Sequence, residues 1–194
     1  MIQKLIVACW AIFWTYWLAM RWFTKPTQEV RQGKWNFLQL RFLVFWAVIG
    51  ALVFKDNRVW ASLMGPTLPI LAGYPAAVSA ISIILVASGM VIAILARIRL
   101  AGNWSHEVAF KKDHELIENG VYGYMRHPIY SGVLLMLLGT ALFVGRVGTF
   151  ALFLVMLWFW RVKSVKEEEL LAEHFPDEYP AYKTRVKALI PFVW

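Results

Sequence analysis

Apolar residues along this chain form long blocks. They do not recur with the period of an amphipathic helix, which exposes one face to water. Five blocks stand out: residues 5–20, 42–54, 74–96, 129–144 and 147–160. Only the third reaches the roughly 20 residues of an unaided membrane span, but flanking residues can lengthen the others. The pattern predicts an all-α integral membrane protein with five transmembrane helices in a single membrane domain, residues 1–194.

The fourth and fifth blocks are separated only by Gly145 and Arg146, which predicts a tight antiparallel hairpin. Residues 161–174 contain no Pro or Gly and are rich in good helix formers, so the fifth helix is predicted to leave the membrane unbroken until Pro176 ends it. At 1.5 Å per residue, a helix over residues 147–175 is about 43 Å long. That length crosses the hydrocarbon and leaves several turns in water.

Composition supports a membrane protein, since 60% of the residues are hydrophobic and only 16% are charged, against roughly 25% in an ordinary soluble domain. The net charge of +8 does not indicate nucleic-acid binding, because the basic residues lie between apolar blocks, where they meet anionic headgroups. A single cysteine, Cys9, excludes an intrachain disulfide and a thiolate metal cluster. No histidine pair has close metal-ligand spacing, and no metal is predicted.

Lys and Arg are concentrated in the segments that follow the first, third and fifth blocks. By the positive-inside rule, the N-terminus is expected outside and the C-terminus in the cytoplasm. Residues 97–128 and 161–194 then share the cytoplasmic face, together with nearly all the acidic residues and every histidine. This face is where we expect chemistry, carried by residues 97–194, whereas residues 1–96 form spans one to three.

The densest group of reactive side chains runs directly into the fourth span and ends in Arg126-His127-Pro128-x-Tyr130-x-Gly132. Pro128 suits the first turn of a helix, whose free N–H groups and positive end favour an anion. His127 and Tyr130 are three residues apart, so both can point into one pocket at headgroup depth. Gly132 allows another helix to approach closely.

Two further segments are predicted to complete this pocket. Gly120 and Gly123 flank Tyr122 in a tight turn whose backbone could read a flat heterocycle. On the extension of the fifth helix, Glu167 lies one turn from Lys163. A carboxylate at such a position could accept both hydroxyls of a ribose.

These motifs, with the preceding His114-x-Leu116-Ile117-x-x-Gly120-Val121-Tyr122 and the following Glu167-Glu168-x-Leu170, Phe175 and Glu178-Tyr179-x-x-Tyr182, resemble the isoprenylcysteine carboxyl methyltransferase family. The resemblance covers residues 103–191, and several motifs occur in the expected order. Five spans and a short N-terminus are similar to the compact prokaryotic members, the archaeal one among them, which implies a prokaryotic cell membrane.

The resemblance implies that S-adenosylmethionine binds between residues 114–130 and the helix that carries Glu167. The implied cofactor contacts are His114, Glu115, Leu116, Ile117, Tyr122, His127, Tyr130, Lys163 and Glu167. Lys163 departs from the family pattern, in which we expect Arg; it keeps the charge and loses the bidentate geometry. The family's eukaryotic substrate is prenylated cysteine, so the implied partners are a lipid-borne small molecule or prenylated protein and the membrane lipids.

A substrate carboxylate is already ionised at neutral pH and needs no general base to attack a sulfonium methyl group. Positioning is therefore expected to dominate catalysis, and Arg97 or Arg99 at the end of the third span are candidates to orient that carboxylate. Three alternatives stay open: a phospholipid N-methyltransferase with the same cofactor, a membrane sterol-type reductase with a nicotinamide cofactor, and a membrane module without enzymatic activity. No strand followed by a glycine-rich turn occurs, which argues against the doubly wound methyltransferase fold.

Overall fold

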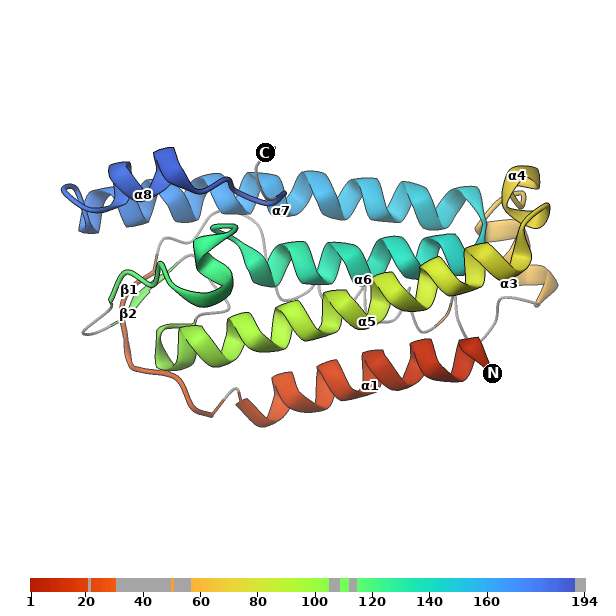
Figure 1. The fold of residues 1–194 in the computed structure, drawn as a ribbon, viewed down its shortest axis with the longest axis horizontal. Coiled ribbons are helices and arrows are strands. Elements are labelled where there is room, and N and C mark those ends of the chain that lie inside the picture. The colour runs from red at the N-terminus through yellow and green to blue at the C-terminus, as the bar shows by residue number, and fades with distance from the viewer. Residues whose placement is uncertain (21, 31–49, 51–56, 105–108, 112–114, 191–194) are drawn as a thin grey trace.

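The structure is a computed structural model, and it describes residues 1–20, 22–30, 50, 57–104, 109–111 and 115–190. Four long helices run alongside one another: α1 (Ile2–Met20), α5 (Pro75–Leu100), α6 (Pro128–Val144) and α7 (Val147–His174) (Figure 1). Three of them, α1, α5 and α7, are long and apolar enough to cross a membrane, and α6 is a shorter apolar helix. The predicted second span, residues 42–54, lies outside the described residues apart from Gly50.

Large apolar side chains on the outward faces of these helices remain exposed. Ile12 and Leu18 on α1, Ile84 on α5, and Leu154 and Trp158 on α7 each expose more than half of their surface. Full burial of such a side chain contributes roughly 1.5–3 kcal/mol, and in water each would forgo about half of this free energy, so these faces belong in lipid. The arrangement confirms a helical membrane protein.

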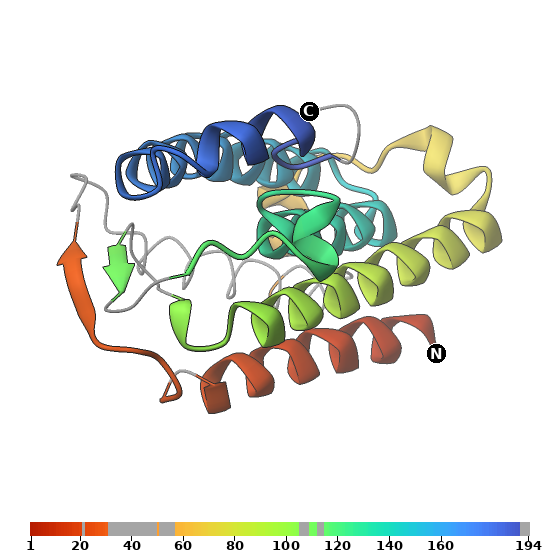
Figure 2. The same ribbon diagram turned by 60° about the vertical axis from the view of Figure 1, so that its left-hand side comes forward.

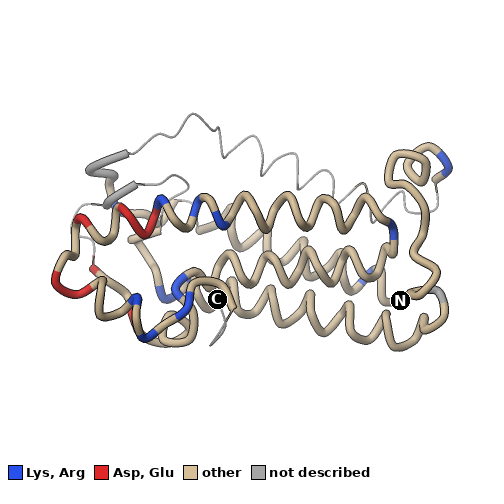
Figure 3. Tube along the Cα trace, turned by 90° about the horizontal axis from the view of Figure 1, so that it is seen from above, with Lys and Arg blue, Asp and Glu red and all other residues tan. Residues whose placement is uncertain are grey.

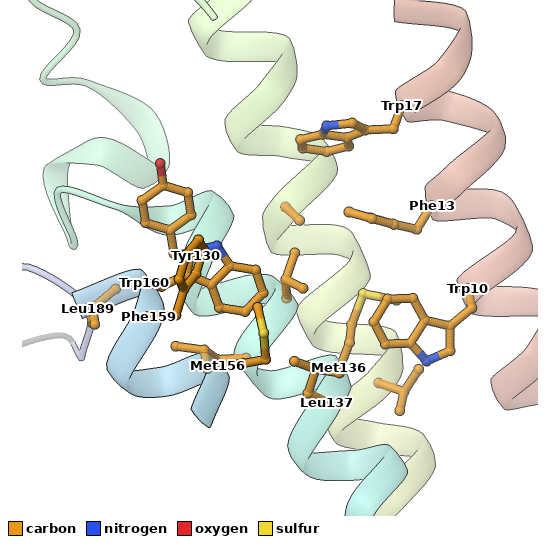
Figure 4. Close-up of a cluster of buried hydrophobic side chains, with 14 of the residues drawn as sticks. Trp10, Phe13, Trp17, Tyr130, Met136, Leu137, Met156, Phe159, Trp160 and Leu189 are labelled. Atoms are coloured by element: carbon orange, nitrogen blue, oxygen red, sulfur yellow. The ribbon is translucent and has the colours of Figure 1, made fainter. Parts of the chain in front are cut away.

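The inner faces pack around a core of aromatic and sulfur-containing side chains. Trp10, Phe13 and Trp17 project from α1 toward the other helices, and Figure 4 shows them across from Met136 of α6. The indole Nε1 of Trp10 donates a hydrogen bond to Thr140 Oγ1 at 3.1 Å. This bond satisfies a buried polar group and ties α1 to α6.

Helices α5 and α6 approach each other most closely because glycines line their contact. A Cβ added to Gly132 would lie 2.5 Å from Gly89 O, and one added to Gly89 would lie 2.3 Å from Gly132 O. Gly139 similarly faces the backbone of Ser82, at 2.7 Å. Small residues at such a crossing let two membrane helices pack backbone to backbone, so the predicted role of Gly132 is confirmed.

The hairpin between α6 and α7 is present as predicted. Gly145 follows α6 with φ +69°, the left-handed conformation that glycine adopts without strain, and its N–H donates to Ala141 O. The next helix, α7, begins at Val147 and continues without a break to His174. The expected single helix is therefore confirmed.

The shorter elements connect or cap this bundle. They are β1 (Thr27–Val30), α3 (Arg58–Leu63), α4 (Pro69–Ala72), η1 (Ala101–Asn103), β2 (Ala109–Lys111), η2 (Gly120–Gly123) and α8 (Tyr179–Arg185). The predicted helical fold class is confirmed, and the antiparallel pairing of strands β1 and β2 (Figure 2) is a detail that the sequence did not predict. Strands of four and three residues are too short to show an alternating pattern in the sequence.

Charged residues gather at one end of the bundle. Figure 3 shows the acidic residues at the end that holds α8, together with most of the basic residues that it colours. The second half of α7 carries many of them, beginning at Arg161. This half follows an apolar stretch, and its composition places it beyond the hydrocarbon, at the end where the candidate site lies.

Candidate functional site

The start of α6 positions two of the predicted site residues. His127 precedes the helix as its N-cap, and Pro128 occupies the first turn, as the sequence predicts. The rings of His127 and Tyr130 stack nearly parallel, with centroids 5.5 Å apart and planes 3° apart. Tyr130 also stacks on Trp160 of α7, at 5.9 Å and 10°. Figure 4 shows Tyr130 and Trp160 together where α6 and α7 meet.

Three residues predicted to belong to the site contact the carboxylate of Glu167 in α7. The hydroxyl of Tyr130 donates a hydrogen bond to Glu167 Oε1 at 2.6 Å, and Lys163 Nζ lies 3.3 Å from the same oxygen. His127 Nδ1 lies 3.6 Å from Glu167 Oε2. The side chain of Lys163 is 1% exposed, whereas that of Glu167 is 22% exposed. The structure therefore brings these four residues, here called the Glu167 cluster, into mutual contact.

Glu168, which sequence reasoning did not select, is the most heavily bonded carboxylate of the site. Its Oε1 accepts hydrogen bonds from Arg126 Nε at 3.0 Å and Arg126 Nη2 at 2.8 Å, and it lies 3.1 Å from His127 Nε2. Lys183 Nζ of α8 lies 3.0 Å from Oε2. Burial alone would raise the pKa of Glu168, but the hydrogen bonds from His127 and Arg126 lower this pKa to about 2.

The sequence around Glu168 explains why it was not selected as a site residue. It lies in a run of three acidic residues, 167–169, which reads as one solvated face. Adjacent residues on a helix point about 100° apart, so the run divides between different environments. Glu169 is exposed and Glu168 is buried. The long-range approach of Arg126 and His127, 42 and 41 residues away, explains the burial of Glu168.

The main chain of residues 186–189, here called the C-terminal strap, lies beside the start of α6. Its carbonyl oxygens accept hydrogen bonds from Arg126 N at 2.8 Å, His127 N at 2.9 Å and Ser131 Oγ at 2.6 Å. The guanidinium of Arg126 also donates to the strap, through Nη1. The strap thus satisfies N–H groups at the helix start that have no partner within the helix. Sequence reasoning gave it no role.

The predicted tight turn is the 3₁₀ helix η2, where Gly120 adopts φ +63°. Tyr122 is buried, and its carbonyl accepts a hydrogen bond from Tyr182 Oη at 2.7 Å, so this carbonyl is already paired. Arg99 is exposed, and its Nε donates to Asn119 Oδ1 at 2.5 Å, next to the turn. Arg99 therefore lies close to the cofactor loop that the resemblance implies.

The loop before η2 is only partly described. Glu115 is exposed, whereas Leu116 packs against the apolar cluster formed by the tyrosines of α8. Ile117 is half-buried. His114 lies outside the described residues. The cofactor contacts implied for these four residues remain predictions.

Arg97 is buried at the end of α5. Its Nη1 donates to Ala101 O at 2.5 Å, its Nη2 donates to Met20 O at 2.9 Å, and the guanidinium carbon lies 4.6 Å from the ring centroid of Trp104. These contacts tie the end of α1 to the end of α5. Within the part of the chain that the structure describes, neither Arg97 nor Arg99 hydrogen bonds to a side chain of the Glu167 cluster.

Comparison with known proteins bears on this arrangement. A model of the phospholipid methyltransferase family matches residues 76–178, which include all but the first residue of α5, the whole of α6 and α7, and all of the Glu167 cluster. The match therefore covers more than half of the chain. It includes both helices that form the cluster, whereas α1 and α4 lie before the matched residues and α8 and the C-terminal strap lie after them.

Individual relatives carry a more specific name, protein-S-isoprenylcysteine O-methyltransferase. The relative from Schizosaccharomyces pombe is 37% identical over 101 residues, which are 50% of this chain and 43% of the relative. The one from Saccharomyces cerevisiae is 28% identical over 167 residues, 84% of this chain and 66% of the relative. The one from Rattus norvegicus is 30% identical over 118 residues, 59% of this chain and 42% of the relative.

This chain thus spans less than two thirds of the length of each of these relatives. Their shared name agrees with the motifs around His127 and Glu167, and the family match covers the helices that carry them. The chain therefore belongs to the phospholipid methyltransferase family, and these relatives confirm the resemblance of its motifs to isoprenylcysteine carboxyl methyltransferases.

Proposed function

We propose that this protein transfers the methyl group of S-adenosylmethionine to the carboxylate of a prenylated cysteine or a similar lipid-borne acceptor. The observation that carries the proposal is the Glu167 cluster at the polar end of an apolar helix bundle. The relatives named protein-S-isoprenylcysteine O-methyltransferase support this reaction over other methyl transfers. Enzyme and acceptor then meet at the membrane surface.

The chemistry of the cluster fits the proposed cofactor. Glu167 would accept hydrogen bonds from the ribose hydroxyls, since a carboxylate offers about four lone-pair positions and only part of its surface is covered. Lys163 would hold the carboxylate of the cofactor. Its ammonium group lies 5.3 Å from the ring centroid of Tyr130, so the aromatic ring stabilises this cation beside the site. When bound, S-adenosylmethionine supplies an electrophilic methyl group.

The protein needs only to align the acceptor carboxylate with the methyl group. A carboxylate is ionised near neutral pH, so no residue has to remove a proton from it. Arg99 is the better candidate to orient it, because Arg97 already donates to two main-chain carbonyls. A prenyl chain gains roughly 0.8 kcal/mol per CH₂ kept in lipid, which favours sideways entry of the acceptor from the bilayer.

The proposed topology has five spans, an outside N-terminus and a cytoplasmic site. It is supported by the concentration of basic residues in the segments that follow the first, third and fifth predicted spans. Three of the described helices are long and apolar enough to cross a membrane, and the shorter apolar helix α6 would be a fourth span. The fifth is the apolar stretch 42–54 of the sequence.

A second function, phospholipid N-methylation, is favoured by the name of the matching family. Purified protein would be given radiolabelled S-adenosylmethionine with farnesylated N-acetylcysteine, its methyl ester, unprenylated N-acetylcysteine or phosphatidylethanolamine. We expect label only in the first acceptor, because the ester lacks the nucleophile and the unprenylated compound lacks the lipid anchor. Methylation of phosphatidylethanolamine without methylation of the prenylated acid would refute the carboxyl assignment.

A further inference from the structure

The buried carboxylate of Glu168 joins three elements of the fold. It lies in α7, Arg126 and His127 lie at the start of α6, and Lys183 lies in α8. Glu168, Arg126 and His127 all have nearly buried side chains, while Lys183 is 53% exposed. Glu168 and the carbonyls of the C-terminal strap therefore both hold the start of α6.

The contact between Glu168 and His127 specifies which ring nitrogen carries a hydrogen. The pKa of Glu168 is about 2, so its carboxylate is ionised and can only accept hydrogen bonds. His127 Nε2, 3.1 Å from Oε1, must therefore be the protonated nitrogen. The other ring nitrogen, Nδ1, then faces Glu167 Oε2 at 3.6 Å. The parallel stack on Tyr130 fixes the plane of the same ring.

We infer that Glu168 is a positioning residue that fixes the tautomer and ring orientation of His127, and that it thereby sets the affinity of the Glu167 cluster for its cofactor. The inference rests on the proposed function, because it concerns the same site. It assigns Glu168 no contact with cofactor or acceptor. Its partners Arg126 and His127 account for three of its contacts.

The alternative is that Glu168 only stabilises the fold through its ion pairs. The two roles differ in what happens once His127 is removed. If Glu168 acts through His127, its replacement costs no further affinity in a chain that already lacks the imidazole. If it acts through Arg126 and Lys183 alone, the two losses add.

A double-mutant cycle on the full chain in detergent separates them. Binding of S-adenosylhomocysteine would be measured by calorimetry for wild type, Glu168→Gln, His127→Ala and the double variant. We expect each single variant to bind about 10- to 100-fold more weakly, and the double variant to bind no more weakly than His127→Ala alone. Lys183→Met, which removes the most exposed partner of Glu168, should change affinity less than threefold, roughly the effect of a surface ion pair.

Additive losses, or unchanged affinity in Glu168→Gln, would overturn the inference while leaving the proposed function intact. Wild-type protein that binds no S-adenosylhomocysteine would overturn both. Should Glu168→Gln fail to fold, nitrogen NMR of wild-type protein with labelled histidine decides the matter, with His127→Ala giving the assignment. A hydrogen on Nε2 supports the inference, and a neutral ring protonated only on Nδ1 contradicts it.

Discussion

The carboxylate of Glu167 receives a hydroxyl and an ammonium group on one oxygen, yet part of its surface remains open. Tyr130 and Lys163 both contact Oε1, whereas His127 Nδ1 lies 3.6 Å from Oε2. A distance of 3.6 Å is too long for a good hydrogen bond. One oxygen is therefore saturated, and the other keeps capacity for a ligand.

At this position we predict that Glu167→Ala and Tyr130→Phe each weaken binding of S-adenosylhomocysteine by about 1–3 kcal/mol, through lost polar contacts. Calorimetry on detergent-purified protein measures the change, and circular dichroism checks that the helices persist. Glu169→Ala removes a neighbouring carboxylate that is exposed and should bind like wild type. Equal affinity in all of these variants would remove Glu167 and Tyr130 from the site.

Sequence reasoning identified the residues whose partners are close in the chain. Lys163 and Glu167 are one helical turn apart, and His127 and Tyr130 share the first turn of α6, so helical geometry alone brings each pair together. Glu168 is different. Its burial depends on how α7 packs against a segment about 40 residues earlier, and no local rule encodes that packing.

Among the elements, α5 and α6 form the closest contact of the bundle through glycines that face backbone atoms. Neither helix can move away without exposing a polar backbone to lipid or opening a void, and neither can approach further. The start of α6, which carries His127, is therefore held at a fixed depth relative to α5. Precise packing between helices thus contributes to the geometry of the site.

Gly132→Ala tests this contact. The added methyl group would lie 2.5 Å from Gly89 O and 2.8 Å from Ala93 N, so the helices must separate, and we expect a loss of about 1–3 kcal/mol in stability. Thermal unfolding in detergent measures it. Gly73→Ala is the control, because its added methyl group would lie 3.7 Å from Ile70 O, an ordinary van der Waals contact. A melting temperature unchanged by Gly132→Ala would contradict the close approach.

Helix α8 offers a prediction on pH. Burial, with the negative charge of Glu168, raises the pKa of Tyr179, and burial raises the pKa of Tyr182. The folded state thus holds both protons more tightly than the unfolded state, where tyrosine titrates near about 10. The contribution of these two protonated tyrosines to folding stability is complete below about pH 10 and is lost as the pH rises further.

We therefore expect the melting temperature to fall between about pH 10 and 11, and to fall less steeply in Tyr179→Phe. Melting curves across this range provide the measurement. The exposed Tyr124, changed to Phe, serves as the matched control and should leave the slope as in wild type. A slope that Tyr179→Phe does not alter would show that the Tyr179 proton is not linked to folding.

The elements themselves were predicted unevenly. The α6–α7 hairpin and the long α7 follow from local features, a Gly-Arg turn and a run of helix formers, and both were confirmed. The pairing of β1 with β2 and the position of the C-terminal strap join segments far apart in the chain. Short non-local pairings of this kind leave no periodic signal in the sequence.

Over the whole molecule, the apolar sides and the charged end of the helix bundle indicate its orientation in a membrane. Exposed apolar side chains cover the sides of the bundle, and the Glu167 cluster lies at the end that carries α8. The opposite end carries α3 and α4 (Figure 1). A lipid-borne acceptor in the leaflet next to the charged end would have the shortest path to the cluster.

Labelling of intact cells tests the proposed orientation. In a chain with Cys9→Ser, single cysteines replace Arg58 in α3 and Glu178 beside α8, both of which are exposed. We expect an impermeant thiol reagent added outside to label Arg58→Cys and to label Glu178→Cys only after the cells are opened. The reverse pattern would mean that the site faces the exterior.

The C-terminal strap has a consequence for synthesis of the protein on the ribosome. Ser131 bonds to a residue 58 positions later, so His127 and Tyr130 leave the ribosome well before the strap that holds the start of α6. At about 5–20 residues per second, translation leaves the site unfinished for roughly 3–12 s while α6 can already enter the bilayer. A nascent chain can thus be inserted in the membrane before its site can bind a ligand. Chains truncated before Leu189 should insert into the membrane and remain there without binding a ligand.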